Sequence, residues 1–177
     1  VPRGLGAPRF DSFPSRLGQA MFSIPATTHV EFGLGADART VTGSERNEDW
    51  TFDEGDHPET ESEAGDPVPV GNDHGGLQGG ITTGQPIWGE ATWHAPTSIP
   101  KEQRTADWET GEIVEDAQVI GRHDPVLPPR GVPVVEAMLY LTVLDFMLLG
   151  GRINPDRIDD RPGEYETDYH PSNPRNE

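Results

Sequence analysis

The stretch PVVEAMLYLTVLDFMLL, residues 133–149, is apolar nearly all round when it is wound as an α-helix. Pro133 stands at a favoured first position of a helix, and Gly150 with Gly151 ends it. A helix without a polar face is buried in a core or an interface. Its longest apolar run, residues 137–149, is too short to span a bilayer, and Asp145 lies within it. The sequence therefore predicts a buried helix and no transmembrane segment.

A second helix is predicted upstream, over residues 12–23. Asp11 or Ser12 can cap it, Pro14 is tolerated in its first turn, and Pro25 ends it. Its apolar residues recur at helical spacing and give one buried face: Phe13, Leu17, Met21 and Ile24. Strands are predicted over residues 29–32, 39–42 and 87–93. Helices mixed with such strands indicate an α+β fold.

Residues 46–73 are acidic and rich in proline and glycine, which predicts a mobile surface loop. Residues 151–177 are polar and contain four prolines, so we expect a disordered tail. Residues 1–150 then form one domain. Because the first residue is Val1 and residues 1–10 read like the interior of a protein, we expect the chain to be part of a longer one.

The formal net charge is −18, from 31 acidic residues against 13 basic ones, of which only Lys101 is lysine. Such a charge repels itself in dilute salt, whereas in 1 M salt the Debye length falls to about 3 Å. The composition therefore favours a protein that works in concentrated salt, although an ordinary acidic protein with a solvated face is the alternative. Nucleic acids and anionic membranes are disfavoured as partners. The chain has no cysteine and no recognisable signal peptide, so the cytoplasm is the expected location.

Four segments contain side chains or backbone suited to chemistry. The glycine-dense residues 75–84 suit either a tight turn or a ligand cradle, and they match neither the Walker A loop nor the dinucleotide fingerprint. Residues 94–98, HAPTS, suit a phosphate or an ordinary loop. Residues 121–125, GRHDP, with Arg130 beyond them, suit an anion site or a surface ion pair. Residues 21–26 end the first helix, and alone they read as a plain stop. The six histidines are scattered, so no metal site is predicted.

Taken in order, these segments resemble the chorismate synthase family. GLGAPRFD (4–11), AMFSIPA (20–26), HVEFG (29–33) and GSE (43–45) match family motifs. So do NDHGGLQGGI (72–81), GQPI (84–87), HAPTSI (94–99), GRHDP (121–125) and PRGVPVVEAM (129–138). Each match alone is weak, whereas the ordered set is specific.

The resemblance implies a β-α-β sandwich with long helices between two antiparallel sheets, of which this chain forms about half, and a homotetramer. The implied reaction converts 5-enolpyruvylshikimate 3-phosphate to chorismate and phosphate with reduced FMN and no net redox change. Whether NADP-linked flavin reduction belongs to this protein stays open. The implied flavin-binding residues are Pro25, Ala26, Gly79, His94, Ala95, Pro96, Thr97, Ser98 and Arg122. Asp124 is the implied proton acceptor, and Arg130 is a candidate for the anionic groups of the substrate.

Three residues depart from the family pattern. His94 stands at the family lysine, His74 at an alanine and Val126 at a cysteine. The resemblance also places the two catalytic histidines and the first flavin-binding segment in an N-terminal half outside these 177 residues. We therefore expect that this chain alone does not catalyse the reaction. The alternatives are an inactive flavin-binding or scaffold remnant that needs a separate N-terminal half, and an unrelated acidic binding module.

Overall fold

The computed structural model describes residues 1–55 and 64–154. The described helices are α1 (Phe13–Phe22), α2 (Gly43–Arg46) and α3 (Pro128–Leu149), with 3₁₀ turns η1 (Arg9–Asp11) and η2 (Gly35–Arg39). The strands form antiparallel pairs: β1 (Thr27–Phe32) with β6 (Gly89–Trp93), β2 (Trp50–Phe52) with β3 (Pro67–Pro69), β4 (Leu77–Gln78) with β5 (Ile81–Thr82), and β7 (Gln103–Ala106) with β8 (Ile113–Ala117). The predicted α+β class is confirmed. The predicted tail, residues 151–177, lies mostly outside the described residues.

Helix α1 forms as its sequence predicts. The Ser12 side chain accepts a hydrogen bond from the Ser15 N–H at 3.3 Å and caps the first turn. Phe13, Leu17 and Met21 are buried on one face of the helix. The Phe13 ring stacks on Phe146 of α3, with 5.1 Å between the ring centroids. This face joins α1 to α3 at the centre of the core.

Helix α3 begins at Pro128, five residues before the predicted start, and Pro133 lies inside it. Pro128 and Pro129 occupy the first helical positions, where the missing N–H costs nothing. Pro133 lies in the second turn, where its missing N–H removes one intrahelical hydrogen bond. Gly150 and Gly151 follow the last turn as predicted.

Helix α3 is mostly uncovered within the described residues, so its predicted burial in a core or an interface is not provided by this chain alone. Only Thr142 and Phe146 are buried, and large apolar side chains are exposed along the helix: Val132, Val134, Tyr140, Leu141, Leu144 and Leu149. By length and composition alone α3 is long and apolar enough to cross a membrane, which the expectation of no such segment did not take into account. That expectation counted only residues 137–149, whereas the helix has 22 residues. Core helices pass the same test, so it is weak support for a membrane span.

Two other regions also differ from the predictions. Residues 39–42 form no strand, because the Thr42 and Glu45 side chains make a capping box that starts α2 instead. The acidic stretch of residues 46–73 is more than a loop, since β2 pairs with β3 within it and Asp53 is 4 % exposed. The β7–β8 hairpin, over residues 103–117, was not predicted either.

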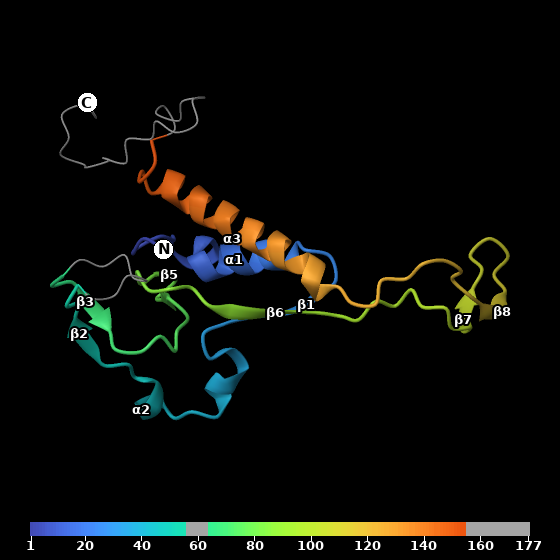
Figure 1. The fold of residues 1–177 in the computed structure, drawn as a ribbon, viewed down its shortest axis with the longest axis horizontal. Coiled ribbons are helices and arrows are strands. Elements are labelled where there is room, and N and C mark those ends of the chain that lie inside the picture. Colours follow the sequence, from blue (N-terminus) through green and yellow to red (C-terminus); the bar gives the residue numbers. More distant parts are fainter. Residues whose placement is uncertain (56–63, 155–177) are drawn as a thin grey trace.

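Helices α1 and α3 lie side by side over the β1–β6 pair, and the β7–β8 hairpin projects far from this body (Figure 1). Strand β1 pairs with β6 in the register Val30 to Ala91 and Phe32 to Gly89. The buried core comprises Leu5, Phe13, Leu17, Met21, Ile24, Leu77 and Phe146. This core fixes both ends of α1, and the predicted site residues lie at those ends.

Candidate functional site

The turn after α1 is bonded to the loop after β6. Pro25 and Ala26 follow the helix, and Ala26 adopts the left-handed conformation with φ 69°. The Ala26 carbonyl accepts a hydrogen bond from the His94 N–H at 3.1 Å. Two of the predicted flavin-binding segments therefore meet at the C-terminal end of α1.

The start of α3 reaches the same place. Gly131 lies so close to Trp93, the last residue of β6, that a Cβ atom on it would stand 3.0 Å from the ring. Arg130 precedes Gly131 and His94 follows Trp93 in sequence. The packing of a glycine on an indole ring thus brings Arg130 towards the HAPTS loop.

Asp124 lies between two guanidinium groups. Its Oδ2 accepts a hydrogen bond from Arg130 Nη1 at 2.8 Å, and its Oδ1 lies 4.0 Å from Arg122 Nη2. The side chains are 38 %, 66 % and 86 % exposed for Asp124, Arg130 and Arg122. Exposed pairs of this kind stabilise a fold by about 0–1 kcal/mol. The cluster is therefore available for ligands and contributes little to stability.

The HAPTS loop is mostly exposed. His94 Nδ1 lies 2.8 Å from the Ala95 carbonyl oxygen, a contact in which the ring nitrogen donates. Thr97 and Ser98 are exposed, and Pro96 is half-buried. Their hydroxyls can donate to a phosphate. The loop therefore has donors that suit a phosphate.

Gly79 is the predicted site residue that this chain does not bring to the cluster. It lies in the turn between β4 and β5, next to Gly80, whose carbonyl accepts a hydrogen bond from the Phe13 N–H at 2.8 Å. Phe13 is the first residue of α1, whereas Ala26 follows its last turn. A ten-residue helix is about 15 Å long, so Gly79 stands one helix length away. A Cβ atom on Gly79 would meet nothing within 4 Å, which leaves open space beside it.

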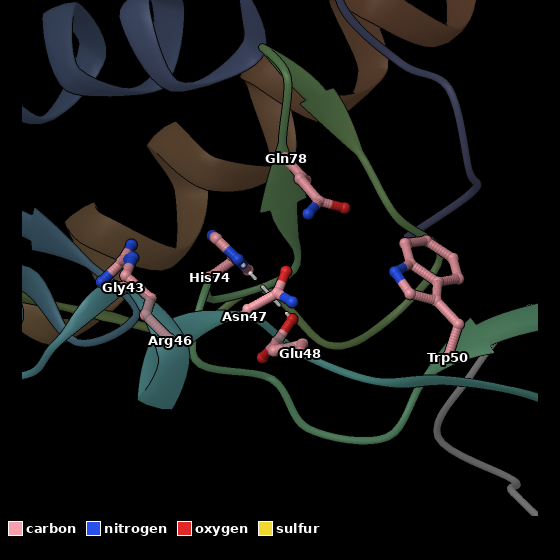
Figure 2. Close-up of a pocket in the computed structure, with 7 residues that line it drawn as sticks. All are labelled: Gly43, Arg46, Asn47, Glu48, Trp50, His74 and Gln78. Carbon is pink, nitrogen blue, oxygen red and sulfur yellow. Dashed lines mark ion pairs between the residues drawn. The ribbon is translucent and has the colours of Figure 1, made fainter.

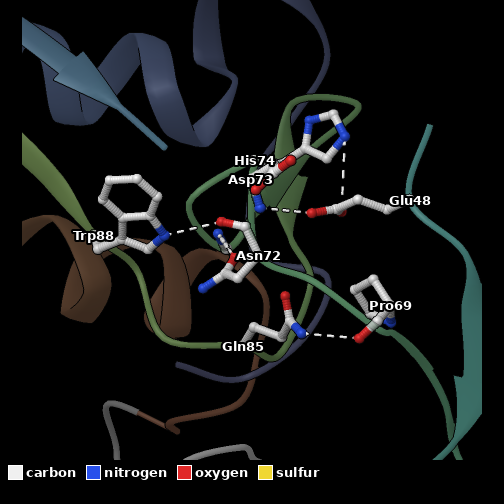
Figure 3. Close-up of polar contacts among 8 residues, drawn as sticks. Glu48, Pro69, Asn72, Asp73, His74, Gln85 and Trp88 are labelled. Carbon is white, nitrogen blue, oxygen red and sulfur yellow. Dashed lines mark hydrogen bonds and ion pairs between the residues drawn. The ribbon is translucent and has the colours of Figure 1, made fainter. Parts of the chain in front are cut away.

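The remainder of the glycine-dense stretch forms a tight turn. Asn72 accepts a hydrogen bond from the Gly76 N–H at 2.6 Å through its side chain, and its amide donates to the Pro86 carbonyl at 2.9 Å. The Trp88 indole N–H donates to the Asn72 carbonyl at 2.9 Å (Figure 3). The plainer alternative for residues 72–76, a structural turn, is the one that the contacts support.

A pocket that sequence reasoning missed lies beside this turn. It has a volume of about 320 Å³ and is lined by Gly43, Arg46, Asn47, Glu48, Trp50, His74 and Gln78 (Figure 2). Most of these residues fall in the stretch predicted to be a loop. The Thr-x-x-Glu capping signature at residues 42–45 is the signal that could have indicated ordered structure there.

Among the described residues, three carboxylates have pKa values below their ordinary range, and these three lie outside the Asp124 cluster. The His29 ring and then the Ala36 N–H lower the pKa of Glu31. The Thr42 N–H lowers the pKa of Glu45, and the N–H groups of Glu109 and Thr110 lower that of Asp107. In residues 1–55 and 64–154, no three metal-binding side chains gather in one place.

The family model described as chorismate synthase matches residues 1–148. The chain belongs to the chorismate synthase family. This membership overturns the alternative of an unrelated binding module and confirms the resemblance drawn from the ordered motifs.

Relatives and a solved structure agree with this assignment. The chain is 82 % identical to the chorismate synthase of Halorubrum lacusprofundi, and it covers 45 % of that protein. It is 74 % identical to the chorismate synthase of Halobacterium salinarum, again over 45 % of the relative. A crystal structure of a chorismate synthase matches 85 % of this chain and 35 % of its own, with a TM-score of 0.58 and 27 % identity. The chain thus spans less than half the length of the curated relatives it matches.

Proposed function

We propose that this chain supplies part of the active site of a chorismate synthase. The reaction would convert 5-enolpyruvylshikimate 3-phosphate to chorismate and phosphate, with loss of a ring proton. The observation that carries the proposal is the meeting of three family motifs at one end of α1. The Ala26–His94 hydrogen bond joins two of them, and the Gly131–Trp93 contact adds the third.

The residues at this end fit reduced FMN by their chemistry. Arg122 is highly exposed, and its Nη2 lies 4.0 Å from Asp124 Oδ1, which is too far for a hydrogen bond. Its guanidinium can therefore bind an anion. The hydroxyls of Thr97 and Ser98 add donors, and the turn at Pro25 and Ala26 offers backbone. When bound, reduced FMN would supply the electron-rich ring that the family reaction requires. We propose that these residues hold the cofactor and exclude water from one side of it.

We propose that Asp124 accepts the ring proton and that Arg130 binds an anionic group of the substrate. The two carboxylate oxygens of Asp124 face the guanidinium groups of Arg130 and Arg122. Substrate binding would draw Arg130 away from the carboxylate, because the two anions compete for one guanidinium. His94 stands at the family lysine, so this site has an imidazole in place of an ammonium group.

The proposed division of labour is that this chain binds flavin, whereas turnover needs residues outside the 177. The test is the release of phosphate from 5-enolpyruvylshikimate 3-phosphate, assayed with reduced FMN in molar KCl. We expect none from this chain alone and turnover from a longer chorismate synthase that contains it. Phosphate release by the chain alone would overturn the division, and no turnover by the longer protein would overturn the proposed activity.

We also propose that the working protein is a salt-adapted, cytoplasmic homotetramer. The net charge of −18 and relatives from Halorubrum and Halobacterium support salt adaptation. The exposed apolar side of α3 supports burial in an assembly, because monomers rarely expose a long apolar patch. Light scattering across a KCl series tests both points. Loss of the assembly only below molar salt is the expected result.

A further inference from the structure

The pocket beside α2 contains a cationic side chain, one nitrogen of which has no hydrogen-bond partner among the described residues. Arg46 is the last residue of α2, and its Nη1 atom is buried. Among the described residues no acceptor bonds to this atom. A buried donor without an acceptor is unfavourable, and a guanidinium is suited to a planar or tetrahedral oxyanion.

The fold holds Arg46 in this place. The Thr42 hydroxyl and N–H both bond to Glu45 Oε2, at 2.8 and 2.7 Å, and this capping box sets the start of the short helix. The Arg46 N–H then bonds to the Thr42 carbonyl at 3.1 Å. These bonds therefore fix the backbone from which the Arg46 side chain extends.

The one acidic group that lines the pocket is already bonded. The Glu48 side chain is 7 % exposed, its Oε1 accepts a hydrogen bond from the Asp73 N–H at 2.5 Å, and its Oε2 lies 3.7 Å from His74 Nε2. The Asp73 N–H thus occupies one carboxylate oxygen, and the His74 ring lies beside the other. His74 stands at an alanine of the family pattern, so this neighbour of Glu48 is a departure of this chain.

Uncharged donors complete the lining. Gln78 extends its amide towards the centre of the pocket, Asn47 lies across from it, and the ring of Trp50 closes one side (Figure 2). The volume of about 320 Å³ is ample for a phosphate or carboxylate group together with part of the molecule that carries it. The pocket shares no residue with the proposed flavin and substrate site.

We propose that this pocket binds a small molecule through a phosphate or carboxylate group held by Arg46, with the amides of Asn47 and Gln78 as additional donors. Arg46 provides the fork of parallel N–H groups, and the bonded Glu48 keeps the second charge of the pocket away from the oxyanion. The site is independent of the proposed reaction. An experiment can therefore support or overturn the proposed anion site without affecting the flavin proposal.

The probe is inorganic phosphate, titrated into the chain in KCl at constant ionic strength and followed by the ³¹P line width. Saturable broadening is expected, weakened about tenfold or more in Arg46→Met because a charge-assisted hydrogen bond is lost. Arg39→Met removes the same charge from a nearby exposed position and should leave binding unchanged. Arg46→Lys keeps the charge and should restore part of the affinity. Circular dichroism shows whether each variant is folded.

Two further titrations identify the source of the oxyanion. Acetate that displaces phosphate supports a site for either group, and acetate that fails to displace it supports a phosphorylated ligand. Phosphate that binds this chain but not a longer chorismate synthase overturns the proposal, because residues outside the 177 then occupy the pocket. No saturable broadening in the folded chain, or equal loss in the Arg46→Met and Arg39→Met variants, overturns the proposal.

Discussion

The turn at residues 72–76 is bonded to three other segments of the chain, whereas the described bonds of residues 121–130 stay within that stretch or next to it. In the turn, Asp73 accepts from the Leu34 N–H at 2.9 Å and donates to Glu48, while Asn72 bonds to Pro86 and Trp88. In residues 121–130, the short contact is the exposed Arg130–Asp124 pair. Both stretches match family motifs. The difference indicates that one motif builds the fold and the other presents reactive groups.

The largest expected effect separates these roles at Asp124. In an active chorismate synthase that contains this chain, Asp124→Ala should lower kcat by about 10²–10⁴-fold, the usual contribution of a general base. The free energy of unfolding should change by less than about 0.5 kcal/mol, because an exposed ion pair is lost. Steady-state kinetics and urea unfolding on the same samples measure both. A variant that unfolds easily and turns over normally would reverse the comparison.

The turn should show the opposite behaviour at Gly33. A Cβ atom there would lie 2.2 Å from the Asp73 carbonyl oxygen, and the residue has φ 57°. Gly33→Ala should therefore lower the free energy of unfolding by roughly 3 kcal/mol, from left-handed strain and overlap with backbone. Chemical denaturation in molar KCl measures it.

Gly18→Ala is the matched control for this change. Gly18 lies within α1, and nothing stands within 4 Å of the added Cβ. The same substitution should stabilise the helix by about 0.5–1 kcal/mol. Equal effects at Gly18 and Gly33 would mean that the close approach to Asp73 does not exist.

The smallest expected effect concerns pH and the capping box that positions Arg46. The Thr42 N–H lowers the pKa of Glu45 in the folded state. The ionised Glu45 side chain therefore contributes to stability above the pKa that it has in the unfolded state. This contribution is lost as pH falls through its pKa in the folded state. Stability should fall less steeply below about pH 4 in Glu45→Gln than in the unaltered chain. Glu102→Gln, next to the exposed hairpin, is the control. If the free energy of unfolding changed with pH identically in both variants, the capping box would not contribute to the acid dependence.

The sequence predicted α1 well, because its apolar spacing, Ser12 cap and Pro25 stop all agree. It also predicted the body of α3, but placed its start at Pro133 because Pro128 and Pro129 were overlooked as earlier first-turn prolines. The short strands β2 and β3 were not predicted. Their sequences are part of an acidic stretch, and each forms only by pairing with the backbone of the other. Burial of α3 could not be judged, because apolar composition does not say whether its partner lies within the same chain.

The candidate site was predicted in part. The motifs indicated residues 25–26, 94–98, 122, 124 and 130, of which the structure bonds Ala26 to His94 and Asp124 to Arg130. The resemblance grouped Gly79 with these residues, yet Gly79 lies at the opposite end of α1 from Ala26 and His94. The order of motifs in a sequence does not give their separation in space. The Arg46 pocket could not be foreseen, since its lining comes from residues 43–50, His74 and Gln78, which only the fold brings together.

The measurement that tests the central claim most directly is binding of reduced FMN to this chain, under anaerobic conditions in molar KCl, by equilibrium dialysis. The claim is that the cluster at the C-terminal end of α1 holds the flavin. We expect saturable binding that weakens about tenfold or more in Arg122→Met, since a charge-assisted contact to the phosphate is lost. Arg104→Met, which removes an exposed arginine from the distant hairpin, should bind like the unaltered chain. No binding by the folded chain, or equal weakening in both variants, would contradict the account.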